Sequence, residues 1–114
     1  MSDTKRDSAP HILAKRAARV AAAPFVKPVG AWNIEAARYR GLLASSYLSA
    51  EQRDAARSSA VALLEEIRKQ EEAMRVALAG EPPHGVIDDL HKSYARLSAQ
   101  LQETIELMRD TERA

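Results

Sequence analysis

Residues 56–78, ARSSAVALLEEIRKQEEAMRVAL, and residues 87–108, IDDLHKSYARLSAQLQETIELM, carry matching heptads of apolar side chains. Such heptads predict two long helices that pack along one seam. Because a short Pro-Pro turn joins them, we expect an antiparallel coiled-coil-like hairpin of helices at about 50–79 and 86–113. The seam positions are Ala56, Ala60, Leu63, Ile67, Gln70, Met74 and Ala77 in the first helix, and Ile87, Leu90, Tyr94, Leu97, Leu101, Thr104 and Met108 in the second.

Two polar side chains, Gln70 and Tyr94, interrupt this seam and fall opposite each other in the expected hairpin. A buried polar pair fixes the register of a coiled coil at some cost in stability. We therefore expect Gln70 to contact Tyr94. Ser49 and Gln52 have the spacing of a capping box, which predicts the start of the first hairpin helix.

A third helix is predicted at about 31–46, packed across the hairpin. Its aromatic and apolar side chains recur every three or four residues and so form one stripe. We expect this stripe to anchor the helix, although aromatic residues beside Arg40 could instead stack on bases. The opposite side is also apolar, so this helix has two faces to cover, only one of which needs its own chain. The stripe comprises Trp32, Ala36, Tyr39, Leu43 and Tyr47.

The N-terminal part of the chain predicts a short basic amphipathic helix at about 10–23. Leu13, Ala17 and Val20 share one face, and Lys15, Arg16 and Arg19 gather on a neighbouring one. A helix of this length is marginal alone, so we expect it to dock on something or to stay partly unfolded.

The clearest boundary in the chain follows this helix. Pro24 and Pro28 forbid a continuous helix and favour an extended strap. The sequence therefore predicts an all-α protein in two parts. These are a basic N-terminal arm with its strap, at 1–30, and a helical-bundle domain, at 31–114.

Composition limits the class of protein. The chain has 114 residues, a formal net charge of +1 and no cysteine. Its length fits one small domain, and the missing cysteine excludes disulfides, thiolate metal sites and cysteine nucleophiles. No stretch is apolar enough to predict a membrane span, and basic residues interrupt the N-terminal apolar run, unlike a secretory signal. We expect no membrane role and a location in the cytoplasm or within a virion.

Three side chains, His84, Asp88 and His91, have the types and the i, i+4, i+7 spacing of zinc ligands. His84 lies in the turn and a fourth ligand is not evident, so we expect no metal. The sequence has no phosphate-binding glycine loop and no nucleophile motif. It predicts a protein without catalytic activity or cofactor, with a metal-dependent enzyme using these three residues as the alternative.

Charge is unevenly distributed along the chain. Residues 1–60 contain ten Lys and Arg against five Asp and Glu, a charge of +5, whereas residues 61–114 contain seven against eleven, a charge of −4. This split fits self-assembly, with the basic half of one subunit meeting the acidic half of the next. It also fits contact with a nucleic-acid backbone or an acidic partner. The candidate contact residues are Lys15, Arg16, Arg19, Arg38, Arg40, Arg53 and Arg57.

In size, helical content and arginine clusters, the chain resembles the small helical subunits of CRISPR effector complexes. The resemblance implies a non-enzymatic subunit that contacts nucleic-acid backbone without reading sequence. We therefore predict a small subunit of a larger nucleoprotein assembly, with protein partners or copies of itself. The alternative is a protein–protein adaptor, chaperone or phage structural protein that self-assembles through its arm and its two-faced helix.

Overall fold

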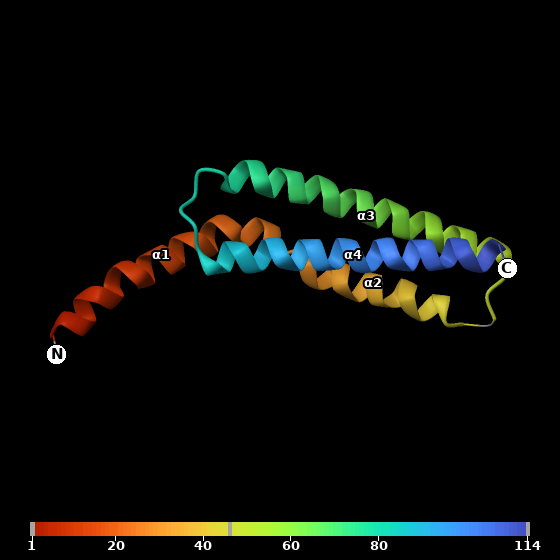
Figure 1. The fold of residues 1–114 in the computed structure, drawn as a ribbon, viewed down its shortest axis with the longest axis horizontal. Helices are drawn as coiled ribbons and strands as arrows, with labels where there is room; N and C mark the ends of the chain where they lie inside the picture. Colours follow the sequence, from red (N-terminus) through yellow and green to blue (C-terminus); the bar gives the residue numbers. More distant parts are fainter. Residues whose placement is uncertain (1, 46, 114) are drawn as a thin grey trace.

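The computed structural model describes residues 2–45 and 47–113, and the side chains of residues 10–45 and 47–109. In this part of the chain it contains four helices and no strand, which confirms the all-α class. The molecule is elongated, 67 × 28 × 18 Å, with α1 beginning at one end and α4 ending at the other (Figure 1). The helices are α1 (Ser2–Val26), α2 (Val29–Leu43), α3 (Ala50–Leu78) and α4 (Gly85–Arg113).

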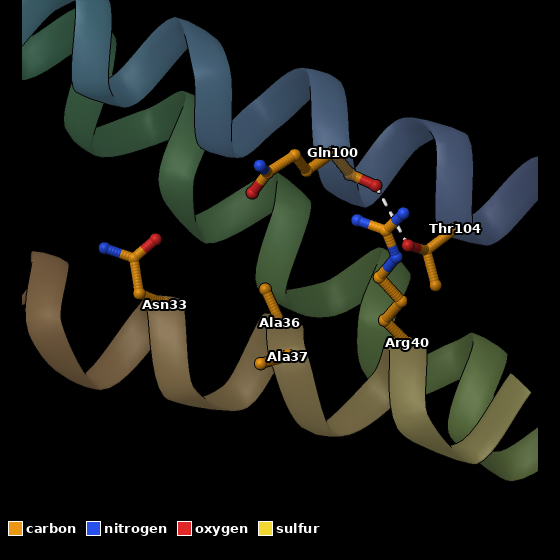
Figure 2. Close-up of a pocket in the computed structure, with 6 residues that line it drawn as sticks. All are labelled: Asn33, Ala36, Ala37, Arg40, Gln100 and Thr104. Atoms are coloured by element: carbon orange, nitrogen blue, oxygen red, sulfur yellow. Dashed lines mark hydrogen bonds between the residues drawn. The ribbon is translucent and has the colours of Figure 1, made fainter. Parts of the chain in front are cut away.

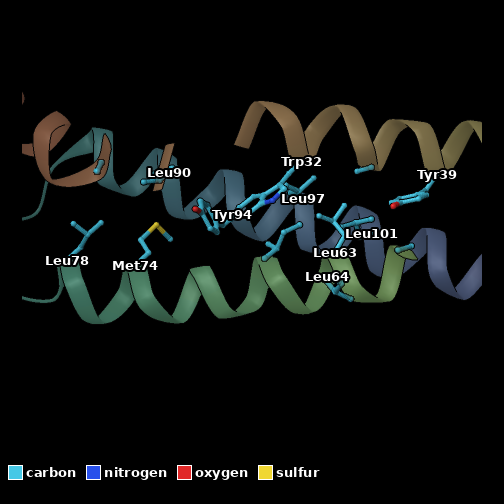
Figure 3. Packing of buried hydrophobic residues seen from close by; sticks show 14 of the residues in the cluster. Trp32, Tyr39, Leu63, Leu64, Met74, Leu78, Leu90, Tyr94, Leu97 and Leu101 are labelled. Carbon is cyan, nitrogen blue, oxygen red and sulfur yellow. The ribbon is translucent and has the colours of Figure 1, made fainter. Parts of the chain in front are cut away.

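Helices α3 and α4 lie side by side and antiparallel along most of the molecule (Figure 1). α3 starts at the capping box, where the Ser49 hydroxyl accepts from the Gln52 N–H at 3.1 Å and the Gln52 side chain accepts from the Ser49 N–H at 2.9 Å. The core runs along the seam (Figure 3). Its buried residues include Leu63, Leu64, Ile67, Met74 and Leu78 of α3, and Ile87, Leu90, Tyr94, Leu97, Leu101 and Met108 of α4.

A third helical layer packs against the α3–α4 hairpin. The C-terminal half of α1 covers the part near the turn of the hairpin, and α2 covers the rest. Both helices contact α3 and α4, and the N-terminal half of α1 extends past the turn of the hairpin (Figure 1). α1 packs through Ala18 and Ala22, which are 4% and 0% exposed. The division of the chain at residue 30 into an arm and a bundle domain stays a prediction.

The expected extended strap is instead a helical corner. α1 continues through Pro24, and the Lys27 N–H donates to the Ala23 carbonyl at 3.2 Å. Pro24 has no N–H and so leaves the Val20 carbonyl without its helical donor, which is tolerated because Val20 lies at the surface, where water can donate instead. Pro28 precedes the first turn of α2, whose N–H groups have no intrahelical partner anyway. Pro24 thus lies within α1, and the chain turns at Lys27 and Pro28 without becoming extended.

The predicted pairing of Gln70 with Tyr94 is wrong. Gln70 is exposed on α3, whereas Tyr94 is 1% exposed and turns towards the α1–α2 corner. Its hydroxyl donates to the Phe25 carbonyl at 2.6 Å, and its ring meets Trp32 edge-on with the centroids 5.5 Å apart. The Phe25 carbonyl belongs to the last turn of α1, where helical donors run out. Tyr94 therefore supplies that donor and ties α1 to the hairpin.

Helix α2 ends at Leu43, earlier than expected, and Ser46 lies outside the described residues. The chain must leave the helix here to reach the capping box that starts α3. Tyr47 consequently lies in the connection, 94% exposed, and does not join the aromatic stripe. Leu43 is half-buried, and Trp32 and Tyr39 are buried within the core.

Candidate functional site

One side of α1, called here its outer face, consists of Ile12, Leu13, Arg16, Arg19 and Val20. Leu13, Arg16 and Val20 recur at i, i+3 and i+7, so they lie on one side of the helix. The three apolar side chains are 57%, 64% and 70% exposed in chain order, and both arginines are exposed. Large apolar side chains and cations therefore share a solvent-facing surface, which is typical of an interaction site.

The orientation of α1 differs from the simplest reading of its sequence. Ile12, Leu13 and Val20 are the bulkiest apolar residues of the predicted helix at 10–23, yet α1 packs through the small residues Ala18 and Ala22. Ala14, Ala18 and Ala22 recur at i, i+4 and i+8, and this spacing is the sequence signal that could have predicted which side of α1 is buried. Small side chains let two helices approach closely, so the alanine side packs on the bundle and the bulky side faces solvent.

The stretch of sequence that contains the outer face of α1 is basic. No Asp or Glu occurs between Asp7 and Glu35. Among the described side chains, no carboxylate forms an ion pair with Lys15, Arg16 or Arg19, all of which are exposed. These three cations are thus available to an external anionic group.

The two arginines of α2 do not form a cluster, although they are close in sequence. Arg40 faces α4 and reaches towards Gln100 and Thr104, where it lines a groove of about 230 Å³ with Asn33, Ala36 and Ala37 (Figure 2). Arg38 lies on the α3 side of α2, with its guanidinium carbon 5.4 Å from the centre of the Tyr39 ring. A helix rotates about 100° per residue, so positions two apart point to opposite sides.

The remaining predicted cations lie at the start of α3, far from the outer face of α1 along the molecule (Figure 1). Arg53 and Arg57 are half-buried, and the Arg57 guanidinium donates to the Asp54 carboxylate at 2.6 Å. An i,i+3 pair of this kind contributes a few tenths of a kcal/mol, about 0.2–0.5, to a helix. The seven candidate residues are therefore distributed over three helices. Lys15, Arg16 and Arg19 lie together on α1, Arg53 and Arg57 lie one turn apart on α3, and Arg38 and Arg40 point apart on α2.

The aromatic stripe belongs to the core and does not form a platform for bases. Trp32 is 5% exposed and Tyr39 is 2% exposed, so neither ring presents a face to solvent. The Tyr39 hydroxyl donates to the Glu35 carboxylate at 2.6 Å. Burial of Tyr39 raises its pKa, and this hydrogen bond to Glu35 raises the pKa further.

The three metal-ligand candidates do not form a cluster. Within the described residues, no group of three or more His, Cys, Asp or Glu side chains is arranged to hold a metal ion. The Nδ1 atom of His84 accepts from the Val86 N–H at 3.1 Å, and its ring stacks at 6.3 Å on His11 of α1. The His84 side chain therefore caps the start of α4 and contacts α1 from the turn.

Similarity to other proteins adds nothing to this description. No known protein family, curated protein or solved structure matches the chain. In the described part of the chain, no helix has both the length and the apolar character needed to span a bilayer.

Proposed function

We propose that this protein is a non-enzymatic small helical subunit of a larger assembly, and that it docks on an acidic protein surface through the outer face of α1. The observation that carries the proposal is the position of Leu13 and Val20. Both are more than half exposed, and both lie on the side of α1 that faces away from its own bundle.

The mixture of apolar and basic side chains favours a protein as the partner. Covering Ile12, Leu13 and Val20 removes apolar area from water, at about 25 cal/mol per Å². Arg16 and Arg19 lie among them and can pair with carboxylates in bidentate geometry. A phosphate backbone would satisfy the arginines and leave the apolar side chains in water.

The position of α1 also suits a docking element. Its C-terminal half is held by Ala18, Ala22 and the Tyr94–Phe25 hydrogen bond, so the helix leaves the bundle in a defined direction. Its N-terminal half extends beyond the hairpin (Figure 1). A helix oriented before binding loses less conformational entropy when a partner covers it.

Contact with a nucleic-acid backbone is the second candidate function. The stretch between Asp7 and Glu35 favours it, because four cations and no carboxylate occur there. Such contacts would not read sequence, and affinity would fall steeply with added salt. The dispersal of Arg38, Arg40, Arg53 and Arg57 over separate surfaces favours it less.

The test is co-purification of the tagged chain from its native cells, with and without nuclease treatment. We expect partners that survive nuclease, and we expect Arg16→Glu with Arg19→Glu to lose them. Reversal of two exposed lysines elsewhere, Lys69→Glu with Lys92→Glu, is the control and should retain them. Partners that disappear with nuclease would favour the second candidate. Identical partners for the parent and the α1 variant would contradict both.

A further inference from the structure

We propose that the outer face of α1 docks on a second copy of this chain, on the acidic face that α4 presents near its C-terminal end. The inference rests on the proposed docking role of α1 and names the partner. It follows from charge complementarity between two surfaces of the same molecule.

The receiving surface, called here the acidic face of α4, consists of Ala99, Glu103, Glu106 and Leu107. Ala99, Glu103 and Leu107 recur at i, i+4 and i+8, so they lie on one side of the helix. All four residues are exposed, and Leu107 has 45% of its surface accessible. The Glu106 carboxylate accepts from the Gln102 amide at 3.1 Å, which orients it at the surface. Two carboxylates and one large apolar side chain thus share this face, and the exposed Arg96 lies two turns before Glu103 on the same side.

The two surfaces match in chemistry. Arg16 and Arg19 on one copy find Glu103 and Glu106 on the other, and Leu107 meets the exposed aliphatic side chains of α1. Complementary charge of this kind fixes register and disfavours wrong pairings, while the apolar centre supplies the area removed from water.

The arrangement of the two faces limits the kinds of assembly. The outer face of α1 lies towards one end of a molecule 67 Å long, and the acidic face of α4 lies towards the other (Figure 1). When each copy offers both faces to the other, the contact closes a two-fold dimer; when the two faces bind two different neighbours, it generates a ring or an open filament.

The experiment is sedimentation velocity of the purified full chain, over rising protein concentration and at low and high salt. We expect the parent to associate, and salt to weaken the association. Arg16→Glu with Arg19→Glu places like charges across the interface, and so does Glu103→Arg with Glu106→Arg. Each double variant should weaken association by roughly tenfold or more. All four positions are exposed, so circular dichroism should show an unchanged helical content.

Mixing the two reversed variants is the decisive step. Each variant places like charges across its own α1–α4 contact. In the mixture, the reversed α1 of one variant faces the reversed α4 of the other with opposite charge, so the mixture should associate like the parent. The Lys69→Glu, Lys92→Glu variant, which reverses charge elsewhere, should associate unaided. A parent that stays monomeric, or a mixture that stays monomeric, would overturn the contact between α1 and α4. In that case, loss of native partners by the α1 variant alone would still support docking through α1 on a different protein.

Discussion

Tyr94→Phe is the sharpest test of how α1 is held, because it removes a single oxygen atom from the centre of the molecule. The Tyr94 side chain is 1% exposed, and its hydroxyl is a donor to the Phe25 carbonyl at 2.6 Å. The ring remains in the variant, so its edge-on contact with Trp32 and its packing are retained. The change therefore isolates one hydrogen bond between α4 and the end of α1.

The expected magnitude follows from what this hydrogen bond does. A typical hydrogen bond contributes about 0.5–1.5 kcal/mol net, and a buried acceptor left without a donor costs about 1–3 kcal/mol. We expect the free energy of unfolding to fall by about 1–2 kcal/mol, measured by urea denaturation with an unchanged slope. We also expect amide hydrogen exchange to accelerate in α1 more than in α3 or α4, because α1 loses its tie to the hairpin.

Tyr39→Phe is the matched control. Its hydroxyl donates to Glu35 of the same helix, so its loss unties no pair of helices. This variant should leave exchange in α1 unchanged. A Tyr94→Phe variant with wild-type stability within about 0.3 kcal/mol, and with no selective exchange in α1, would refute the role given to Tyr94.

Three further results are expected. Gln70→Ala should change the free energy of unfolding by less than about 0.5 kcal/mol because Gln70 is exposed. Ile67→Ala, at a position that is 0% exposed, should cost about 2–5 kcal/mol in the same urea titration. Similar losses for the two variants would place Gln70 in the seam after all. Ser49→Ala should cost about 0.5–2 kcal/mol through loss of the capping box, and a neutral result would show that the box contributes nothing to α3. Burial raises the pKa of Tyr94 above its ordinary value of 10.0, so the folded state favours the neutral phenol. That contribution is complete below pH 10 and is lost as pH rises through the raised pKa, so stability should fall at alkaline pH, and less steeply in Tyr94→Phe; equal slopes in the two proteins would count against this.

Hairpin formation was predictable because its signals are local and redundant. The heptads in residues 56–78 and 87–108, the Pro-Pro turn and the capping box at Ser49 agree on where α3 and α4 begin and end. Each signal depends on residues close in sequence, so no knowledge of tertiary contacts is required. The all-α class follows from the same agreement.

The corner between α1 and α2 could not be predicted in this way. Pro24 and Pro28 predict a break in the helix, and the structure has one between α1 and α2. A sharp corner between two helices and an extended strap are both compatible with the backbone restrictions of proline. The choice depends on Tyr94, which is distant in sequence and donates to Phe25. The same contact explains why the predicted Gln70–Tyr94 pair is wrong. A heptad pattern does not show which neighbouring helix a polar side chain contacts, and the Tyr94 hydroxyl contacts α1.

The candidate site was predictable in composition but not in geometry. The basic character of Lys15, Arg16 and Arg19 is evident from the sequence, and so is the amphipathic pattern of that segment. Which side of α1 faces the bundle depends on how closely its backbone approaches α3 and α4. Alanine packing at Ala18 and Ala22 leaves Leu13 and Val20 exposed, and the proposed docking role of α1 depends on this orientation.

The measurement that tests the central claim most directly is site-specific photo-crosslinking in the native cells. A photoreactive amino acid in place of Leu13 reports what covers the outer face of α1, and the same amino acid in place of Ser58, which is exposed on α3, is the control. We predict a discrete macromolecular crosslink from position 13, mapping to the acidic face of α4 in a second copy, and none from position 58. No crosslink from position 13, or the same products from both positions, would contradict the docking role of α1.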